Sequence, residues 1–237
     1  QQTPIELSCK DVFPHPVNHV SLWYRFRVSD DCENWGEWTD WIDPNGYEVE
    51  KTIYFKEDSC HELEYYCKDG LGNQGPILSE IDIVDTQSPV INKSIIGPWT
   101  GDCLLENEED KCIIDTATTI HVESYDPQPH PVNDVTCDWS YEVIDNDGAS
   151  GGEQGLIPPF DIQFTEESEH LLTITCRDSL GNEEVDKEIF FVDKTPPITT
   201  KKYIGPFFEE NGIEWINSYT NVTLFAYDPQ PHPSGVA

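Results

Sequence analysis

Short runs of alternating apolar and polar residues, separated by turn-forming residues, cover most of this chain. Such runs predict β-strands, because successive side chains of a strand point to opposite faces of a sheet. Between residues 87 and 194 the predicted strands are Ile91–Ile96, Thr119–Ser124, Cys137–Val143, Asp161–Phe164, His170–Cys176 and Asp186–Val192. No segment shows sustained helical periodicity, so the pattern predicts an all-β fold.

The sequence also matches itself. Tyr66–Asn73 (YCKDGLGN) corresponds to Thr175–Asn182 (TCRDSLGN), and Tyr125–Pro131 (YDPQPHP) returns unchanged at Tyr227–Pro233. Similarity of this kind at a long, regular spacing is typical of tandem structural repeats. Six or seven short strands in a repeat of about 100 residues favour a two-sheet sandwich with Greek-key connections.

These matches predict three copies of one repeat. The first copy, 1–86, lacks its opening strand, the second, 87–194, is complete, and the third, 195–237, contains only its opening strands. Extra residues in one copy relative to another fall around Asp30–Gly46 and Cys103–Cys112, which we expect to be surface loops. Since the chain opens and closes within a repeat and has no methionine, we expect it to be a piece of a longer protein.

The repeated motifs resemble a known family. The junction pattern D-x-x-x-P (Asp85–Pro89), an aromatic third strand and the pattern C-x-D-x-x-G-N (Cys67–Asn73) are similar to the tandem immunoglobulin-like repeats of bacterial and archaeal cell-surface proteins. The resemblance implies an immunoglobulin-like sandwich in each copy. It implies several functions equally, because such repeats serve as stalks, adhesins, surface layers, filaments and spacers in secreted enzymes.

Eight cysteines test this topology, since paired cysteines must lie at the same end of a sandwich. The strand order places suitable partners together in four pairs, all within one copy: Cys9–Cys67, Cys32–Cys60, Cys103–Cys112 and Cys137–Cys176. Four disulfides would place the protein in an oxidising, extracellular compartment. Two glycosylation sequons, at Asn92 and Asn221, agree with export to the cell surface.

The chain is strongly acidic, with 46 Asp and Glu against 13 Lys and Arg and a net charge of −33. This charge excludes nucleic-acid binding through a basic face, and no apolar run is long enough to insert into a membrane. Some of the acidic residues recur at one end of each predicted sandwich. They are candidate Ca²⁺ ligands, although Asp and Asn also cap turns with their own side chains. The candidates are Asp85, Asp126, Asp178, Asp193 and Asp228.

Two further groups could bind a ligand. The x-Pro-His-Pro loops carry His15, His130 and His232, each of which could bind a metal, contact a neighbouring subunit or cap the sandwich. A tryptophan cluster could stack on sugars if exposed or fill a gap between sheets if buried. It consists of Trp35, Trp38 and Trp41.

No Ser or Cys stands where a His and a carboxylate plainly converge, so the sequence predicts no enzyme. We expect a structural protein that forms a stalk, fibre or surface lattice by contact with copies of itself or with flanking repeats. The alternative is an adhesin, or a carbohydrate-binding accessory region of a secreted enzyme that contacts surface glycans. Apart from Ca²⁺, no cofactor is expected.

Overall fold

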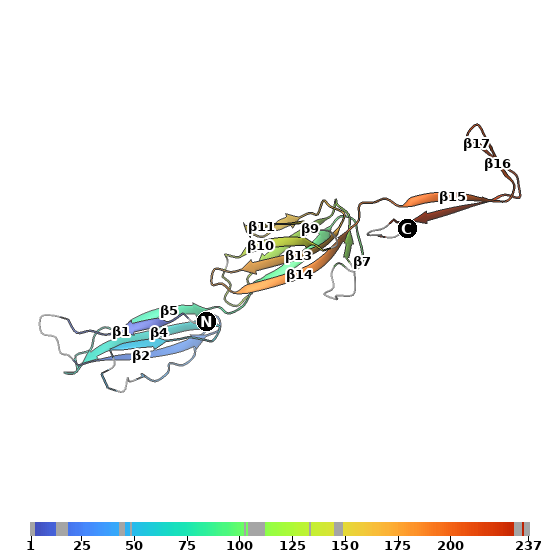
Figure 1. Cartoon of the computed structure of the whole chain (residues 1–237). Helices are drawn as coiled ribbons and strands as arrows, with labels where there is room; N and C mark the ends of the chain where they lie inside the picture. Colours follow the sequence, from blue (N-terminus) through green and yellow to red (C-terminus); the bar gives the residue numbers. More distant parts are fainter. Residues whose placement is uncertain are drawn as a thin grey trace. The chain divides into compact units, whose positions relative to one another are not determined.

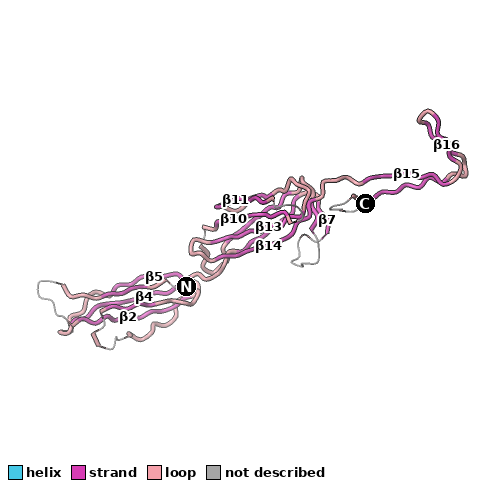
Figure 2. The backbone as a smooth tube through the Cα atoms, viewed as in Figure 1, coloured by secondary structure: helices cyan, strands magenta, loops and turns pink. Residues whose placement is uncertain are grey.

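The protein is all-β in a computed structural model that describes residues 3–12, 19–42, 46, 47, 49–101, 103, 112–132, 134–144, 149–229 and 234. No helix occurs among these residues, and Figure 2 shows strands joined by loops and turns. The chain divides into two compact units. The first comprises Gln1–Val90, Tyr125–Val135 and Arg177–Glu184, and the second comprises Ile91–Ser124, Thr136–Cys176 and Val185–Ala237.

Two sheets make up most of the first unit (Figure 1). One sheet pairs β1 with β3, and the other has the strand order β2-β4-β5. The strands are β1 (Ile5–Ser8), β2 (Val20–Ser29), β3 (Glu50–Ile53), β4 (Ser59–Asp69) and β5 (Leu78–Val84). Leu7 and Ile53 from the first sheet pack against Leu22 and Leu63 from the second, so the core lies between the two sheets as in a β-sandwich.

The second unit also contains two layers. A six-stranded sheet has the order β11-β10-β13-β14-β8-β7, and a three-stranded sheet has the order β12-β9-β6. The strands are β6 (Val90–Ile96), β7 (Trp99–Gly101), β8 (Cys112–Ile114), β9 (Thr119–Tyr125), β10 (Thr136–Val143), β11 (Ser150–Leu156), β12 (Phe160–Ile162), β13 (Glu169–Arg177) and β14 (Glu183–Val192). Fully buried side chains from both sheets form the core, among them Ile120, Ile162, Leu172 and Phe190.

The remaining strands form two separate ribbons. Strand β15 (Ile198–Ile204) pairs with β18 (Asn221–Tyr227), and β16 (Phe207–Glu210) pairs with β17 (Ile213–Ile216). Among the described residues these four strands belong to no larger sheet, and nearly all of their side chains are exposed.

The strand positions follow the sequence repeats. Strands β15 and β6 are both seven residues long, and each ends at the Ile of an Ile-Gly-Pro; β18 and β9 are likewise equal in length, and each ends at the Tyr of Tyr-Asp-Pro. The five strands of the first copy, β1 to β5, are the counterparts of β9, β10, β12, β13 and β14, and its described part contains no counterpart of β6, β7, β8 or β11.

Candidate functional site

The eight cysteines form the four disulfides expected from the sequence. Cys9–Cys67 joins the two sheets of the first unit, with 5.7 Å between the Cα atoms. Cys137–Cys176 instead joins the adjacent strands β10 and β13 of one sheet, with 4.1 Å between the Cα atoms. Leu22 lies opposite Cys67 in the register of β2 and β4, at the position that Cys137 takes in the next copy. The inter-sheet bond has therefore been replaced by a bond within one sheet.

The Pro-His-Pro loop of the second copy is buried against the first. Nδ1 of His130 donates a hydrogen bond to Oδ1 of Asp58 at 2.8 Å. Burial raises the pKa of Asp58, but hydrogen bonds from His130 and Thr86 outweigh it and leave that pKa below its ordinary value. The ring also lies beside Cys32 and Cys60, whose sulfurs are bonded to each other and so are not thiolate ligands. This loop therefore serves as a packed cap. His15 and His232 lie outside the described residues.

The five candidate Ca²⁺ ligands form two groups. Asp85, Asp126 and Asp178 come together in the first unit, where all three are buried. In the second unit Asp193 and Asp228 are linked through one residue, because Oδ2 of Asp193 accepts the backbone N–H of Ser234 at 3.1 Å and Asp228 accepts its hydroxyl at 3.2 Å. Only the first group brings three carboxylates within reach of one cation.

The tryptophan cluster lies in the segment after β2 and packs against two arginine side chains of that strand. The guanidinium of Arg25 lies 4.4 Å from the ring centre of Trp38 and 4.6 Å from that of Trp41. Arg27 lies 4.6 Å from Trp38 and 5.1 Å from Trp35. We call this arrangement the Trp–Arg ladder. Its rings are half-buried and each lies against at least one guanidinium group, so the cluster is neither buried between the sheets nor fully exposed.

Sequence reasoning did not find this ladder. The sequence held two signals. Two arginines in alternate positions of a strand place both guanidinium groups on one face, and a W-x-x-W-x-x-W run follows them. Carboxylates on β4 complete the arrangement: Arg25 forms an ion pair with Glu64 at 2.6 Å, and Arg27 forms one with Glu62.

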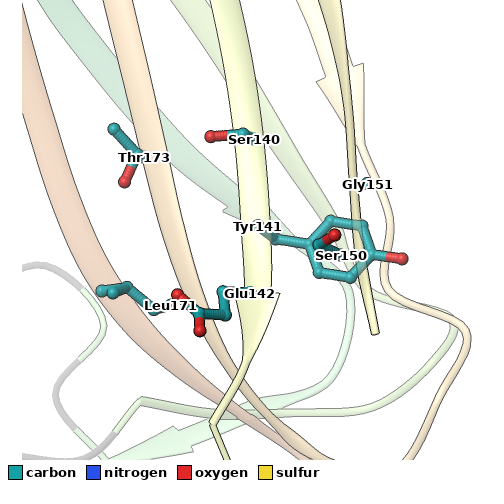
Figure 3. A pocket seen from close by; sticks show the side chains of 7 residues that line it. All are labelled: Ser140, Tyr141, Glu142, Ser150, Gly151, Leu171 and Thr173. Atoms are coloured by element: carbon teal, nitrogen blue, oxygen red, sulfur yellow. The ribbon is translucent and has the colours of Figure 1, made fainter. Parts of the chain in front are cut away.

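A shallow hollow lies on the six-stranded sheet of the second unit. Figure 3 shows Ser140, Tyr141 and Glu142 on β10 beside Leu171 and Thr173 on β13, with the tyrosine ring next to Gly151 on β11. The residues that line it include one carboxylate and no histidine, cysteine or lysine. Its chemistry is that of an ordinary sheet surface and supports no reaction.

Both glycosylation sequons are accessible. Asn92 is exposed on β6 and Asn221 is exposed at the start of β18. Glycosylation at these positions remains a prediction. In the described part of the chain, no helix has the length and hydropathy needed to cross a membrane.

The largest set of exposed apolar side chains lies on the strands of the third copy. Leu224, the fourth residue of β18, is 67% exposed, whereas Val122, the fourth residue of β9, is 0% exposed. Ile216 at the end of β17 is likewise exposed, whereas Ile114 at the end of β8 is buried. Side chains that form the core of the second copy are thus presented to solvent in the third.

Comparisons with known proteins give little further information. No protein-family model matches the chain, and no curated protein matches it. Among solved structures, one that concerns the structural basis of neurohormone perception by the receptor tyrosine kinase Torso is similar at 11% identity, covering 81% of this chain and 70% of that chain. Its TM-score of 0.21 is too low to assign a common fold. The functional interpretation therefore rests on the residues of this chain.

Proposed function

We propose that this chain is a structural segment of an extracellular stalk, fibre or surface lattice, built from immunoglobulin-like Greek-key repeats, and that it associates with further copies of itself. Four disulfides support an oxidising compartment. The acidic surface keeps such a protein soluble between specific contacts. In this proposal the chain holds other molecules in place and catalyses no reaction.

One observation carries the proposal: the third copy exposes side chains whose counterparts in the second copy are buried, and further strands, from another molecule or from flanking repeats, would cover them. In the second copy, β6 lies beside β9 and β8 lies beside β14. In the first copy the strands equivalent to β9 and β14 are β1 and β5, and each has one open edge among the described residues. Strands β15, β16 and β17, the counterparts of β6, β7 and β8, are exposed. We call them the donor strands.

The donor strands of one molecule can complete the first copy of another. Strand β15 would leave β18 and pair with β1, which keeps one antiparallel pairing of the same kind. Strand β17 would then lie parallel to β5, as β8 lies parallel to β14. The exchange gains one strand pairing and covers the exposed side chains of β17, so it follows the logic of strand addition and domain swapping.

Charges support a second copy as the occupant. Lys93, the fourth residue of β6, forms ion pairs with Glu188 and, at 2.6 Å, with Asp186. On β15 the fourth residue is Lys201, and on β5 the equivalent of Glu188 is Glu80, since each glutamate lies five positions before a junction aspartate. Lys201 already forms an ion pair with Glu214 on β17, and in the exchanged form it would also meet Glu80 of the next molecule.

The environment of β5 favours a cation. Burial and the charge of Asp82 raise the pKa of Glu80, and burial raises the pKa of Asp82 despite the opposing effect of His61. Oδ2 of Asp82 is buried without a hydrogen-bond partner among the described residues. Lys201 of a second molecule, placed at the edge of β5, would compensate the negative charges of both carboxylates.

Sedimentation of the 27.0 kDa chain over a range of concentrations tests the proposal. We expect reversible oligomers in the wild type. Lys201→Glu and Glu80→Lys should each weaken association, because each places like charges together. A mixture of the two variants should associate again, since every contact in the mixed chain pairs unlike charges.

Lys202→Glu is the matched control, because the neighbouring side chain of β15 points to the other face of the strand. It makes the same change of net charge and should leave association unchanged. A chain that remains monomeric at all concentrations would contradict self-association. Association without rescue in the mixture would show a different interface between copies.

A further inference from the structure

Three loops of the first unit bring three aspartates to one point. Asp85 follows β5, Asp126 follows β9 and Asp178 follows β13. One carboxylate oxygen of each residue lies within 4.8 Å of the others, and the three residues are only 4%, 8% and 6% exposed. Carboxylates are seldom this buried unless a partner compensates their charge.

The hydrogen bonds around the cluster satisfy two of the three carboxylates. Asp85 accepts the backbone N–H of Gln87 at 2.9 Å and the side-chain amide of Asn182 at 3.3 Å. Asp178 accepts the same amide at 2.7 Å together with the backbone N–H groups of Leu180 and Asn182.

Asp126 differs from the other two. Its Oδ2 accepts the backbone N–H of Val132, but its Oδ1 is buried and has no hydrogen-bond partner among the described residues. A buried carboxylate oxygen without a partner is costly and needs a ligand. Oδ1 is therefore the oxygen of Asp126 that is available to one.

The electrostatics of the cluster favour a cation. Burial raises the pKa of Asp85, and the charges of Asp126 and Asp178 raise it further. Burial likewise raises the pKa of Asp126, and the charges of Asp178 and Asp58 add to the effect. The neighbouring charges that act on these two carboxylates repel them, so the cluster destabilises the fold when all three are ionised.

We propose that Asp85, Asp126 and Asp178 bind a calcium ion. The donors are oxygens from three loops, a set that suits Ca²⁺, which accepts irregular arrangements of oxygen ligands and adds water to complete its shell. Magnesium demands a more regular octahedron, and zinc prefers the nitrogen and sulfur ligands that this cluster lacks. Bound calcium would tie the end of β5 to the Asp126 and Asp178 loops. The proposal does not depend on self-association.

The first copy supplies a matched control. Asp69 caps a turn with the same bonds as Asp178, accepting the backbone N–H groups of Leu71 and Asn73 and the amide of Asn73 at 2.8 to 2.9 Å. It belongs to no three-carboxylate group among the described residues. Asp69→Asn therefore alters an equivalent turn and removes one charge without touching the cluster.

Titration calorimetry of the chelator-treated chain with calcium chloride, at physiological ionic strength, tests the site. We expect one saturable site in the wild type and in D69N, with weaker binding of magnesium. D126N should lower calcium affinity at least about tenfold, because it removes the charge of the uncompensated carboxylate. D126N keeps an oxygen for the bond from Val132, so its fold should persist.

Thermal unfolding provides a second readout. Calcium should raise the Tm of the wild type and of D69N in a concentration-dependent way but leave D126N unchanged. Without calcium, D126N should melt no lower than the wild type, because repulsion is relieved. A wild type that binds no calcium, which would point to a proton shared among the carboxylates, overturns the proposal. Equal calcium binding by D126N and D69N overturns it too.

Discussion

Lys93 on β6 and Glu188 on β14 form an ion pair that joins the two sheets of the second unit. Even with this lysine beside it, burial leaves the pKa of Glu188 above its ordinary value. The pair is thus partly withdrawn from water. An unpaired charge at such a partly buried position costs more free energy than one at the surface.

Replacing this lysine should destabilise the second unit. Lys93→Ala leaves Glu188 and Asp186 without their cation, and we expect a loss of about 1–2 kcal/mol in the free energy of unfolding. Lys187→Ala, at an exposed position between the two carboxylates on β14, should change it by less than about 0.5 kcal/mol. Urea denaturation of the three proteins measures the difference, and equal losses would show that the ion pair contributes nothing.

The raised pKa of Asp82 predicts how the stability of the first unit depends on pH. Its raised pKa means that the ionised carboxylate is disfavoured in the folded state, where it faces His61 and Tyr65 on β4 and Glu80 on its own strand. Asp82→Asn should therefore raise the Tm of the monomer at neutral pH. The gain should disappear as the pH falls through the raised pKa, because the wild-type carboxyl is then neutral too.

Thermal unfolding of both proteins from neutral to acidic pH measures this effect. The side chain is partly exposed, so we expect a stabilisation of at most about 0.5 kcal/mol at neutral pH. Glu184→Gln, at an exposed position on β14, serves as the control and should show no such gain. A Tm advantage of D82N that grows toward acidic pH would contradict the sign argued above.

The disulfides should differ in their contribution to stability. Cys9–Cys67 spans 58 residues and Cys103–Cys112 spans 9, so the first restricts the unfolded chain far more. By the entropy of loop closure, replacing both cysteines of the longer loop by Ala should cost about 1.5 kcal/mol more than doing so in the shorter loop. Denaturation of the two double variants against the wild type measures the two losses. A larger loss for the shorter loop would mean that native-state contacts outweigh chain entropy.

The Trp–Arg ladder predicts a graded series of losses. Trp38 stacks with two guanidinium groups, whereas Trp35 stacks with one. Trp38→Ala should cost about 2 kcal/mol and Trp35→Ala about 1 kcal/mol, with a matching loss of near-ultraviolet circular dichroism for Trp38→Ala. Equal losses from the two variants would show that burial of each ring matters and stacking on arginine does not.

The strands and disulfides could be predicted because both depend on short patterns. Each predicted strand of the second copy coincides with an observed one to within a few residues, since alternating side chains report the two faces of a sheet directly. The short strands β7 and β8 were missed, and so was β11, whose sequence, SGGEQGL, contains three glycines and little that favours a strand. It forms through pairing with β10, where a Cβ on Gly151 would lie 2.7 Å from the ring of Tyr141.

Contacts between side chains from distant segments were harder to predict. The repeated aspartates indicated a shared position, and the structure does bring Asp85, Asp126 and Asp178 together. The contact between His130 and Asp58 gave no signal, because the two residues are not equivalent: Asp58 aligns with Glu167, in the repeated stretch that ends at His61 and at His170. Repetition in a sequence shows which residues are equivalent, but pairings between non-equivalent residues depend on the folded chain.

The disulfides that hold the equivalent strands β4 and β13 should make the two copies respond differently to a pulling force. Cys67 and Cys176 occupy equivalent positions, but the bond from Cys67 reaches back to Cys9 and encloses β2, β3 and most of β4, a separation of 58 residues. The bond from Cys176 reaches only to Cys137 and encloses 39 residues, leaving β6 to β9 outside the closed loop. Under tension the first copy could release little of its chain. In the second copy the opening strands could unfold before the force reaches the disulfide. Each unfolded residue would then lengthen the chain by roughly 3.4 Å. A fibre of such modules would stretch in the second copy while the first held its length.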